Sequence, residues 1–202
     1  MTTALFGGSF DPVHRGHKNV VKALLREIPD IERVIIMPAH VNPFKSADDR
    51  SGRATDEQRL EMCRLAFGDI PQCIVSDFEI RQGGLSYTVL TLEHLAAVYP
   101  EDKLILTVGS DSLESLTTWY RFGDIAKIAD IAAVSRSDAD SFVIEENAAS
   151  VRAAGGRVTV VPAKPFDISS TAIRKKIFNN EEITCYIDKN VVKYIVSENI
   201  YR

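Results

Sequence analysis

The feature that most constrains the fold is the alternation of short apolar runs with helix-like segments along the chain. The apolar runs lie at 4–6, 33–37, 73–75, 104–108, 131–134 and 158–161. Strands that alternate with helices of ordinary length form βαβ crossovers, which make a sheet parallel and cover both of its faces. We therefore predict an α/β fold: a single Rossmann-like, doubly wound parallel sheet with helices on both faces, spanning residues 1–202 as one domain.

Helix boundaries can be placed from the same pattern. Apolar residues recur with a helical period over 16–28, and a second helix is expected to begin at Thr55, with Gln58 completing a capping box. A third helix is predicted over 88–99, because the next residue is proline. Ligands of such folds bind beyond the carboxyl ends of the strands, and the unusual residues of this chain cluster in the loops at those positions.

Composition excludes several classes of protein. The net charge is -4 and lysine and arginine form no run, which argues against binding nucleic acid through its phosphates. No apolar run approaches the roughly 18 residues of a membrane span, so we expect no membrane association and a cytoplasmic location. The three cysteines share no close pair, which predicts buried, reduced thiols. The sequence leaves open whether the chain is a monomer or a homo-oligomer.

The stretch LFGGSFDPVHRGH, which follows the first apolar run, predicts an anion site. Gly7 and Gly8 allow a sharp turn or a close backbone approach. His14 and His17 then face the same way across the start of a helix, where free N–H groups and the positive dipole end favour an anion. Gly16 leaves a gap in which a ring can lie against the backbone.

Other interpretations of this stretch are weaker. It lacks the Gly-Lys-Ser/Thr ending of a Walker loop and the GxGxxG of a dinucleotide site. Two histidines could bind zinc, but no third ligand is near them in the sequence. A glycine-rich turn whose histidines only cap or pack remains an open alternative.

A second cluster, DISSTAIRKKI, begins another amphipathic helix. Ser169, Ser170 and Thr171 are candidate N-caps, and Arg174 follows about one turn inside the helix. Hydroxyls, helix N–H groups and a guanidinium together can hold phosphate. Ordinary capping would explain this segment alone, but two such helix starts in one domain suit a polyphosphate.

GGSFDPVHRGH resembles the GG(S/T)FDPxHxGH signature of the nucleotidyltransferase superfamily, and ISSTAIR resembles its ISSTxIR motif. Within that superfamily the chain is similar to the bacterial nicotinate-nucleotide adenylyltransferases, with SYTVLTL, VGSDSLESLTTWYRF and a closing helix ending in Tyr201 as supporting stretches. The resemblance implies adenylyl transfer from ATP to nicotinate mononucleotide, giving deamido-NAD and pyrophosphate in NAD biosynthesis, with Mg²⁺ on the polyphosphate. The reaction would proceed by direct in-line attack without a covalent intermediate.

Alternatives to this activity are transfer to nicotinamide mononucleotide, transfer to another phosphate ester such as phosphopantetheine, or a regulator that binds nucleotide without turnover. Because both histidines, Lys45 and Arg174 are present, nothing favours the regulator.

The resemblance also implies roles for individual residues, with no protein ligand for a metal among them. The catalytic set is His14, His17, Lys45 and Arg174: the histidines contact ATP phosphates, Arg174 holds the β and γ phosphates, and Lys45 closes over the mononucleotide phosphate. ATP contacts are implied for Gly7, Gly8, Ser9, Phe10, Gly16, Asp111, Arg136, Ile168, Ser169, Ser170 and Thr171.

Mononucleotide contacts are implied for Thr88, Trp119 and Tyr120, with Trp119 stacking on the pyridine ring. Three of the implied residues have plainer interpretations: Trp119 as a packing residue, Asp111 as an N-cap and Arg136 as a solvated loop charge. The chain also reads NPFK where the family often has PPHK, so Phe44 replaces a histidine and His40 is a candidate to supply the missing phosphate contact.

Overall fold

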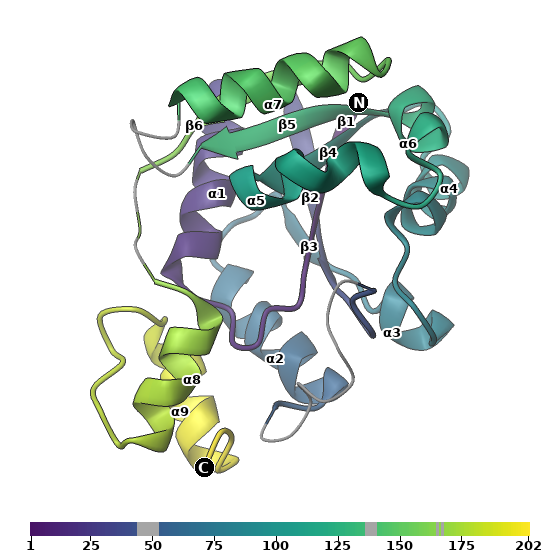
Figure 1. Ribbon diagram of the computed structural model, residues 1–202. Helices are drawn as coiled ribbons and strands as arrows, with labels where there is room; N and C mark the ends of the chain where they lie inside the picture. The colour runs from purple at the N-terminus through teal and green to yellow at the C-terminus, as the bar shows by residue number, and fades with distance from the viewer. Residues whose placement is uncertain (44–52, 136–140, 165, 167) are drawn as a thin grey trace.

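The computed structural model describes residues 1–43, 53–135, 141–164, 166 and 168–202 (Figure 1). The predictions that concern Phe44, Lys45 and Arg136 therefore lie outside the described residues. In the described residues the chain forms one six-stranded sheet in the order β3-β2-β1-β4-β5-β6, and every neighbouring pair is parallel. The strands are β1 (Thr2–Gly8), β2 (Ile31–Pro38), β3 (Cys73–Val75), β4 (Lys103–Gly109), β5 (Ala129–Ser135) and β6 (Val158–Pro162). The predicted doubly wound parallel sheet is confirmed.

The helices connect and cover the strands. They are α1 (Arg15–Glu27), α2 (Asp56–Phe67), α3 (Phe78–Gln82), α4 (Thr88–Val98), α5 (Ser110–Ser115), the 3-10 helix η2 (Leu116–Thr118), α6 (Phe122–Ile128), α7 (Ser141–Ala153), α8 (Ser170–Phe178) and α9 (Lys189–Ser197). Among the described residues, no helix combines the length and apolar character needed to cross a bilayer.

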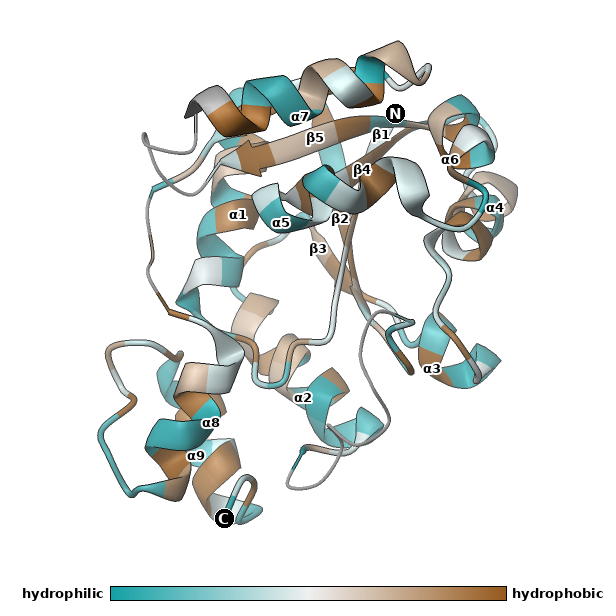
Figure 2. Ribbon diagram, in the orientation of Figure 1, coloured by the Kyte–Doolittle hydropathy of each residue, from teal (hydrophilic) through white to brown (hydrophobic). Residues whose placement is uncertain are grey.

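Each face of the sheet carries its own hydrophobic core, because side chains alternate along the strands. In β1, Ala4 and Phe6 join a core with α1, α2, α8 and α9, whereas Leu5 joins a core with α4, α5, α6 and α7. Helices α7 and α8 accordingly carry both hydrophobic and hydrophilic residues (Figure 2). Burial on both faces explains why the four inner strands, β1, β2, β4 and β5, have continuous apolar sequences, whereas the edge strands β3 and β6 are partly exposed.

The strand order reverses at β1, which pairs with β2 on one side and with β4 on the other. Both neighbouring strands run parallel to β1, so the loops after β1, β2 and β4 leave from the same edge of the sheet. In a doubly wound fold this edge is where a ligand binds. The loops singled out in the sequence are therefore brought together by topology.

Local signals placed several helices correctly. The capping box at the start of α2 is formed: Gln58 N–H donates to Thr55 Oγ1 at 3.2 Å, and Thr55 N–H donates to Gln58 Oε1 at 2.9 Å. The helices predicted over 16–28 and 88–99 are α1 and α4, with ends that differ by one residue.

Two expectations were wrong. The closing helix α9 ends at Ser197 instead of Tyr201, because Asn199 and Tyr201 adopt left-handed φ angles of 52° and 67° that a helix cannot contain. The expectation that all three cysteines are buried also fails. All three are free thiols, but only Cys63 is buried, whereas Cys185, in the loop between α8 and α9, is exposed.

Candidate active site

The loop between β1 and α1 is folded tightly around Phe10. This residue has a left-handed φ of 47° and is 1% exposed. A Cβ on Gly8 would lie 3.1 Å from the Phe10 ring, so glycine is needed there for the turn to close. Phe10 meets the His17 ring edge-on at 5.0 Å between centroids. Its ring therefore supports His17 from the core side, and the nearly complete burial of Phe10 leaves little of its surface for the implied ATP contact.

The two histidines of the motif lie against each other at the N-terminus of α1. His14 is the N-cap residue, and the ring centroids of His14 and His17 are 3.8 Å apart. The backbone N–H of His14 donates to Nδ1 of His17 at 3.1 Å. Because Nδ1 accepts this bond, the proton of neutral His17 is on Nε2. His17 thus presents Nε2–H as a donor suited to a phosphate oxygen.

Gly16 makes this arrangement possible. A Cβ at this position would lie 2.9 Å from both Cε1 and Nδ1 of His14, and 3.2 Å from Phe166. The ring expected to occupy the gap at Gly16 is therefore the imidazole of His14 itself.

The N-terminus of α8 is fastened to the same loop. Ser169 is its N-cap and accepts from the N–H of Ala172 at 3.1 Å, while the hydroxyl of Ser170 donates to the carbonyl of Pro12 at 2.9 Å. Arg174 donates from one guanidinium nitrogen to the carbonyl of Asp11 at 2.7 Å, and from the other to Thr171 Oγ1 at 3.1 Å.

Arg174 and Asp11 are 163 positions apart in the sequence. These contacts therefore join two helix N-termini, two imidazoles and a guanidinium from distant parts of the chain in one neighbourhood. Such a concentration of N–H donors and positive charge favours a polyanion.

The other residues with implied ATP contacts lie at the end of β1, at the start of α5 and before α8. Gly7 and Gly8 end β1, and the Ser9 carbonyl accepts from Arg59. Asp111 is exposed in the first turn of α5, whose N-cap is Gly109, so its alternative interpretation as an N-cap is wrong. Ile168 packs partly buried against the core beneath α1 and α8.

The predicted mononucleotide residues come from two segments that touch. Thr88 begins α4, and the preceding Tyr87 contacts the ring of Tyr120 at 4.6 Å between centroids. Trp119 follows η2, packs partly buried against the core on that face, and donates from Nε1 to Ser115 Oγ at 3.3 Å. The contact between Tyr87 and Tyr120 thus brings Thr88 and Trp119 into one region. Packing and substrate stacking are both compatible with this placement of Trp119.

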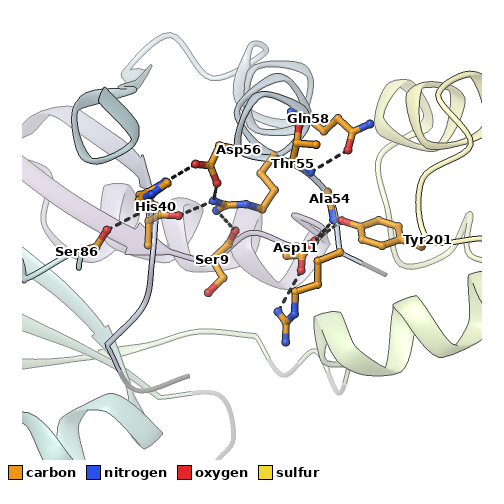
Figure 3. Close-up of polar contacts among 12 residues, drawn as sticks. Ser9, Asp11, His40, Ala54, Thr55, Asp56, Gln58, Ser86 and Tyr201 are labelled. Atoms are coloured by element: carbon orange, nitrogen blue, oxygen red, sulfur yellow. Dashed lines mark hydrogen bonds and ion pairs between the residues drawn. The ribbon is translucent and has the colours of Figure 1, made fainter. Parts of the chain in front are cut away.

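The structure adds residues that the sequence interpretation missed. Arg59, on α2, is 6% exposed and donates to the carbonyls of Ser9 at 2.7 Å and Ala39 at 2.6 Å. It also pairs with Asp56, whose other oxygen contacts Nδ1 of His40 (Figure 3). Arg59 therefore ties together the chain segments that follow β1 and β2. A sequence signal existed, because Arg59 lies on the apolar face of its helix, one turn before Cys63.

Asp11 was quoted within the motif but given no role. Its carboxylate is buried and accepts hydrogen bonds from Tyr201, from the N–H of Ala54 and from Arg53 (Figure 3). No local signal could have shown this, because Tyr201 is 190 positions away.

Known proteins match the chain over most of its length. The cytidylyltransferase-like family matches residues 5–176. A Hydrogenobaculum protein named probable nicotinate-nucleotide adenylyltransferase is 33% identical over 201 residues, which cover 100% of this chain and 98% of the relative. A Caldicellulosiruptor saccharolyticus protein of the same name is 33% identical over 205 residues and is covered completely, as is this chain.

Solved structures share the fold at lower identity. The Plasmodium falciparum nicotinic acid mononucleotide adenylyltransferase complexed with NaAD superimposes with a TM-score of 0.79 at 18% identity, covering 99% of this chain and 97% of that one. The same enzyme complexed with APC gives a TM-score of 0.76 at 17% identity, covering 99% and 96%. From the family match and the full-length relatives, the chain belongs to the cytidylyltransferase-like family and, within it, to the group of nicotinate-nucleotide adenylyltransferases.

Proposed function

We propose that this protein is an enzyme of NAD biosynthesis that transfers the adenylyl group of ATP to nicotinate mononucleotide. The observation that supports the proposal most is the meeting of the two helix N-termini. His14 and His17 lie at the start of α1, and Ser170 and Arg174 fasten the start of α8 to the same loop. The full-length relatives carry the name of this activity.

The proposed reaction is a direct displacement at the α-phosphorus of ATP. A phosphate oxygen of the mononucleotide forms a bond to this phosphorus, and the bond from the α-phosphorus to the bridging oxygen of the β-phosphate breaks, so that pyrophosphate leaves with the electron pair. The protein's task is to align the two phosphates and to stabilise the charge that gathers on the transferred group.

The chain's own groups would divide this task. Nε2–H of His17 would donate to an oxygen of the reacting phosphate, with the His14 ring beside it. Arg174 and the N–H groups at the start of α8 would hold the β and γ phosphates and favour departure of pyrophosphate. Trp119 and Thr88 would face the pyridine nucleotide. Lys45 and Arg136 keep their predicted roles toward the mononucleotide phosphate and adenosine.

Magnesium is proposed to enter with the substrate. In the portion of the chain that is described, no three His, Cys, Asp or Glu side chains gather to form a metal site. The donor set at the two helix starts is instead made of N–H groups and cations, which suit phosphate oxygens. A magnesium ion bound to ATP would neutralise part of its charge, with most of its ligands from the nucleotide and water.

The test is pyrophosphate release in the presence of ATP and magnesium, with nicotinate mononucleotide in one reaction and nicotinamide mononucleotide in the other. We expect much faster turnover of the acid. Comparable rates would replace the proposal by dual specificity, and no release with either would refute the substrate assignment.

A variant then tests the proposed role of His17. His17→Ala should fold and bind ATP but lose most of its turnover. The matched control is His94→Ala, because His94 stacks on Phe78 at 3.7 Å between ring centroids, on α4 and away from the motif. Equal losses in the two variants would remove His17 from the mechanism.

A further inference from the structure

The carboxylate of Asp11 is a buried junction between distant segments of the chain. Asp11 is 2% exposed, and its Oδ1 accepts from the Tyr201 hydroxyl at 2.7 Å and from the N–H of Ala54 at 3.2 Å. Its Oδ2 accepts from Arg53 at 3.1 Å and lies 3.8 Å from Arg174. Figure 3 shows the Tyr201 hydroxyl and Ala54 converging on this one side chain.

A buried carboxylate is stable only when charges and hydrogen bonds replace the water it has lost. Arg53 and Arg174 supply the charges, and Tyr201 and Ala54 supply hydrogen bonds from neutral groups. The consequence for Arg174 is geometric. Its guanidinium donates to the carbonyl of Asp11 and to Thr171 Oγ1, and it forms a longer ion pair, at 3.8 Å, with the carboxylate of Asp11. A displacement of the Asp11 carboxylate therefore changes the ion pair that helps to hold Arg174.

Tyr201 is built into this junction by the turn that follows α9. The left-handed residues Asn199 and Tyr201 reverse the chain, and Tyr201 is 7% exposed, with its ring in the core shared by α1, α2 and α8. Burial, together with the adjacent carboxylate of Asp11, raises the pKa of the Tyr201 phenol. The phenol therefore stays protonated near neutral pH, so that its hydroxyl can donate to Asp11.

We propose that Tyr201 is a positioning residue of the nucleotide site: its hydroxyl holds the carboxylate of Asp11, which holds the guanidinium of Arg174 toward the polyphosphate of ATP. This inference rests on the proposed function, because it takes Arg174 as an ATP ligand. It adds a residue outside both sequence motifs to the machinery that binds ATP.

The competing explanation is that Tyr201 only fills the core. Tyr201→Phe separates the two explanations, because it keeps the buried ring and removes the hydroxyl alone. The matched control is Tyr194→Phe, which removes a hydroxyl from a partly buried tyrosine on α9 that packs against the same core. Thermal unfolding of both variants checks that each still folds.

The measurement is the dissociation constant of magnesium ATP by calorimetry, for the wild type, Tyr201→Phe, Arg174→Gln and the double variant. We expect Tyr201→Phe to weaken ATP binding about tenfold, as the loss of one hydrogen bond to a charged acceptor can do. In the double variant, Tyr201→Phe should add less than about twofold to the effect of Arg174→Gln, because a residue that acts through Arg174 has nothing left to position.

Wild-type affinity in Tyr201→Phe, with or without a lower unfolding temperature, would overturn the inference and leave Tyr201 a packing residue. Effects that multiply in the double variant would also overturn it, since they would show that Tyr201 acts independently of Arg174. The proposed function fails in a different way: the wild type would bind ATP but release no pyrophosphate with either mononucleotide, while the affinities above would still decide the role of Tyr201. A wild type that binds no ATP would refute both.

Discussion

Replacing Gly16 by alanine should lower the catalytic rate without lowering the stability of the fold. The added Cβ would lie 2.9 Å from Cε1 and Nδ1 of His14, whereas carbon atoms in contact are about 3.5 Å apart or more. The imidazole must therefore move by about 0.6 Å or more if the helix keeps its place. Because a misplacement of about 1 Å can cost about a hundredfold in rate, we expect Gly16→Ala to lower kcat about tenfold.

The stability of Gly16→Ala, in contrast to its kcat, is not expected to fall. Alanine in a helix is favoured over glycine by up to about 1 kcal/mol, so the unfolding temperature should stay the same or rise. Gly123→Ala is the matched control, because Gly123 is also the second residue of its helix, α6, and no heavy atom lies within 4 Å of the added Cβ. This control should keep wild-type kcat.

The assays are steady-state pyrophosphate release and thermal unfolding of both variants. Wild-type kcat in Gly16→Ala would refute the reasoning, because it would show that the position of the His14 ring does not matter. A fall in both kcat and unfolding temperature would show that the backbone, and not the ring, yields to the new Cβ.

Three further predictions concern other parts of the molecule. His40→Gln should raise the KM for the mononucleotide about tenfold and leave the KM for ATP unchanged, because Asp56 contacts Nδ1 of His40 and so leaves Nε2 as the ring nitrogen that would contact the phosphate; an unchanged KM for the mononucleotide would exclude the role. A thiol reagent should label Cys185 rapidly in the native protein and the other cysteines only after unfolding, since Cys63 is buried and burial raises the pKa of Cys73 to about 12; three fast thiols would contradict this. A hydrogen bond from Lys18, on α1, lowers the pKa of Asp69 below its ordinary value of 3.8. The ionised carboxylate of Asp69 therefore stabilises the fold fully above about pH 3.8, and this contribution is lost as the pH falls through the lowered pKa. Asp69→Asn should therefore lower the unfolding temperature slightly at pH 7 and by less at pH 2.5, and an equal difference at both values would be inconsistent with the ion pair.

Features that depend on near neighbours were predictable from the sequence. The capping box of α2 needs only Thr55 and Gln58, and the end of α1 follows from the proline two residues later. The sheet was predictable because its inner strands are buried on both faces and so have continuous apolar sequences. The residues at the starts of α1 and α8 were found because their motifs are contiguous.

Features that depend on long-range packing were not predictable. Asp11 reads as an ordinary turn residue, and only the folded chain shows that Tyr201, Arg53 and Arg174 surround it. The end of α9 was misplaced for the same reason, since the chain reverses to bring Tyr201 to Asp11 instead of continuing the helix. Arg59 was predictable only in part: the sequence shows that it lies on the apolar face of its helix, but not that it binds the carbonyls of Ser9 and Ala39.

The junction at Asp11 also sets the time at which the site can form during synthesis. All six strands lie before residue 163, so a growing chain can assemble the sheet before Arg174 and Tyr201 have been made. Domains begin to fold during synthesis, while the ribosome adds about 5–20 residues per second. An interrupted chain that ends after β6 would have its sheet but no second helix start for the anion. If the proposed site binds ATP, its complete set of phosphate donors is therefore expected only after translation has passed the last two helices.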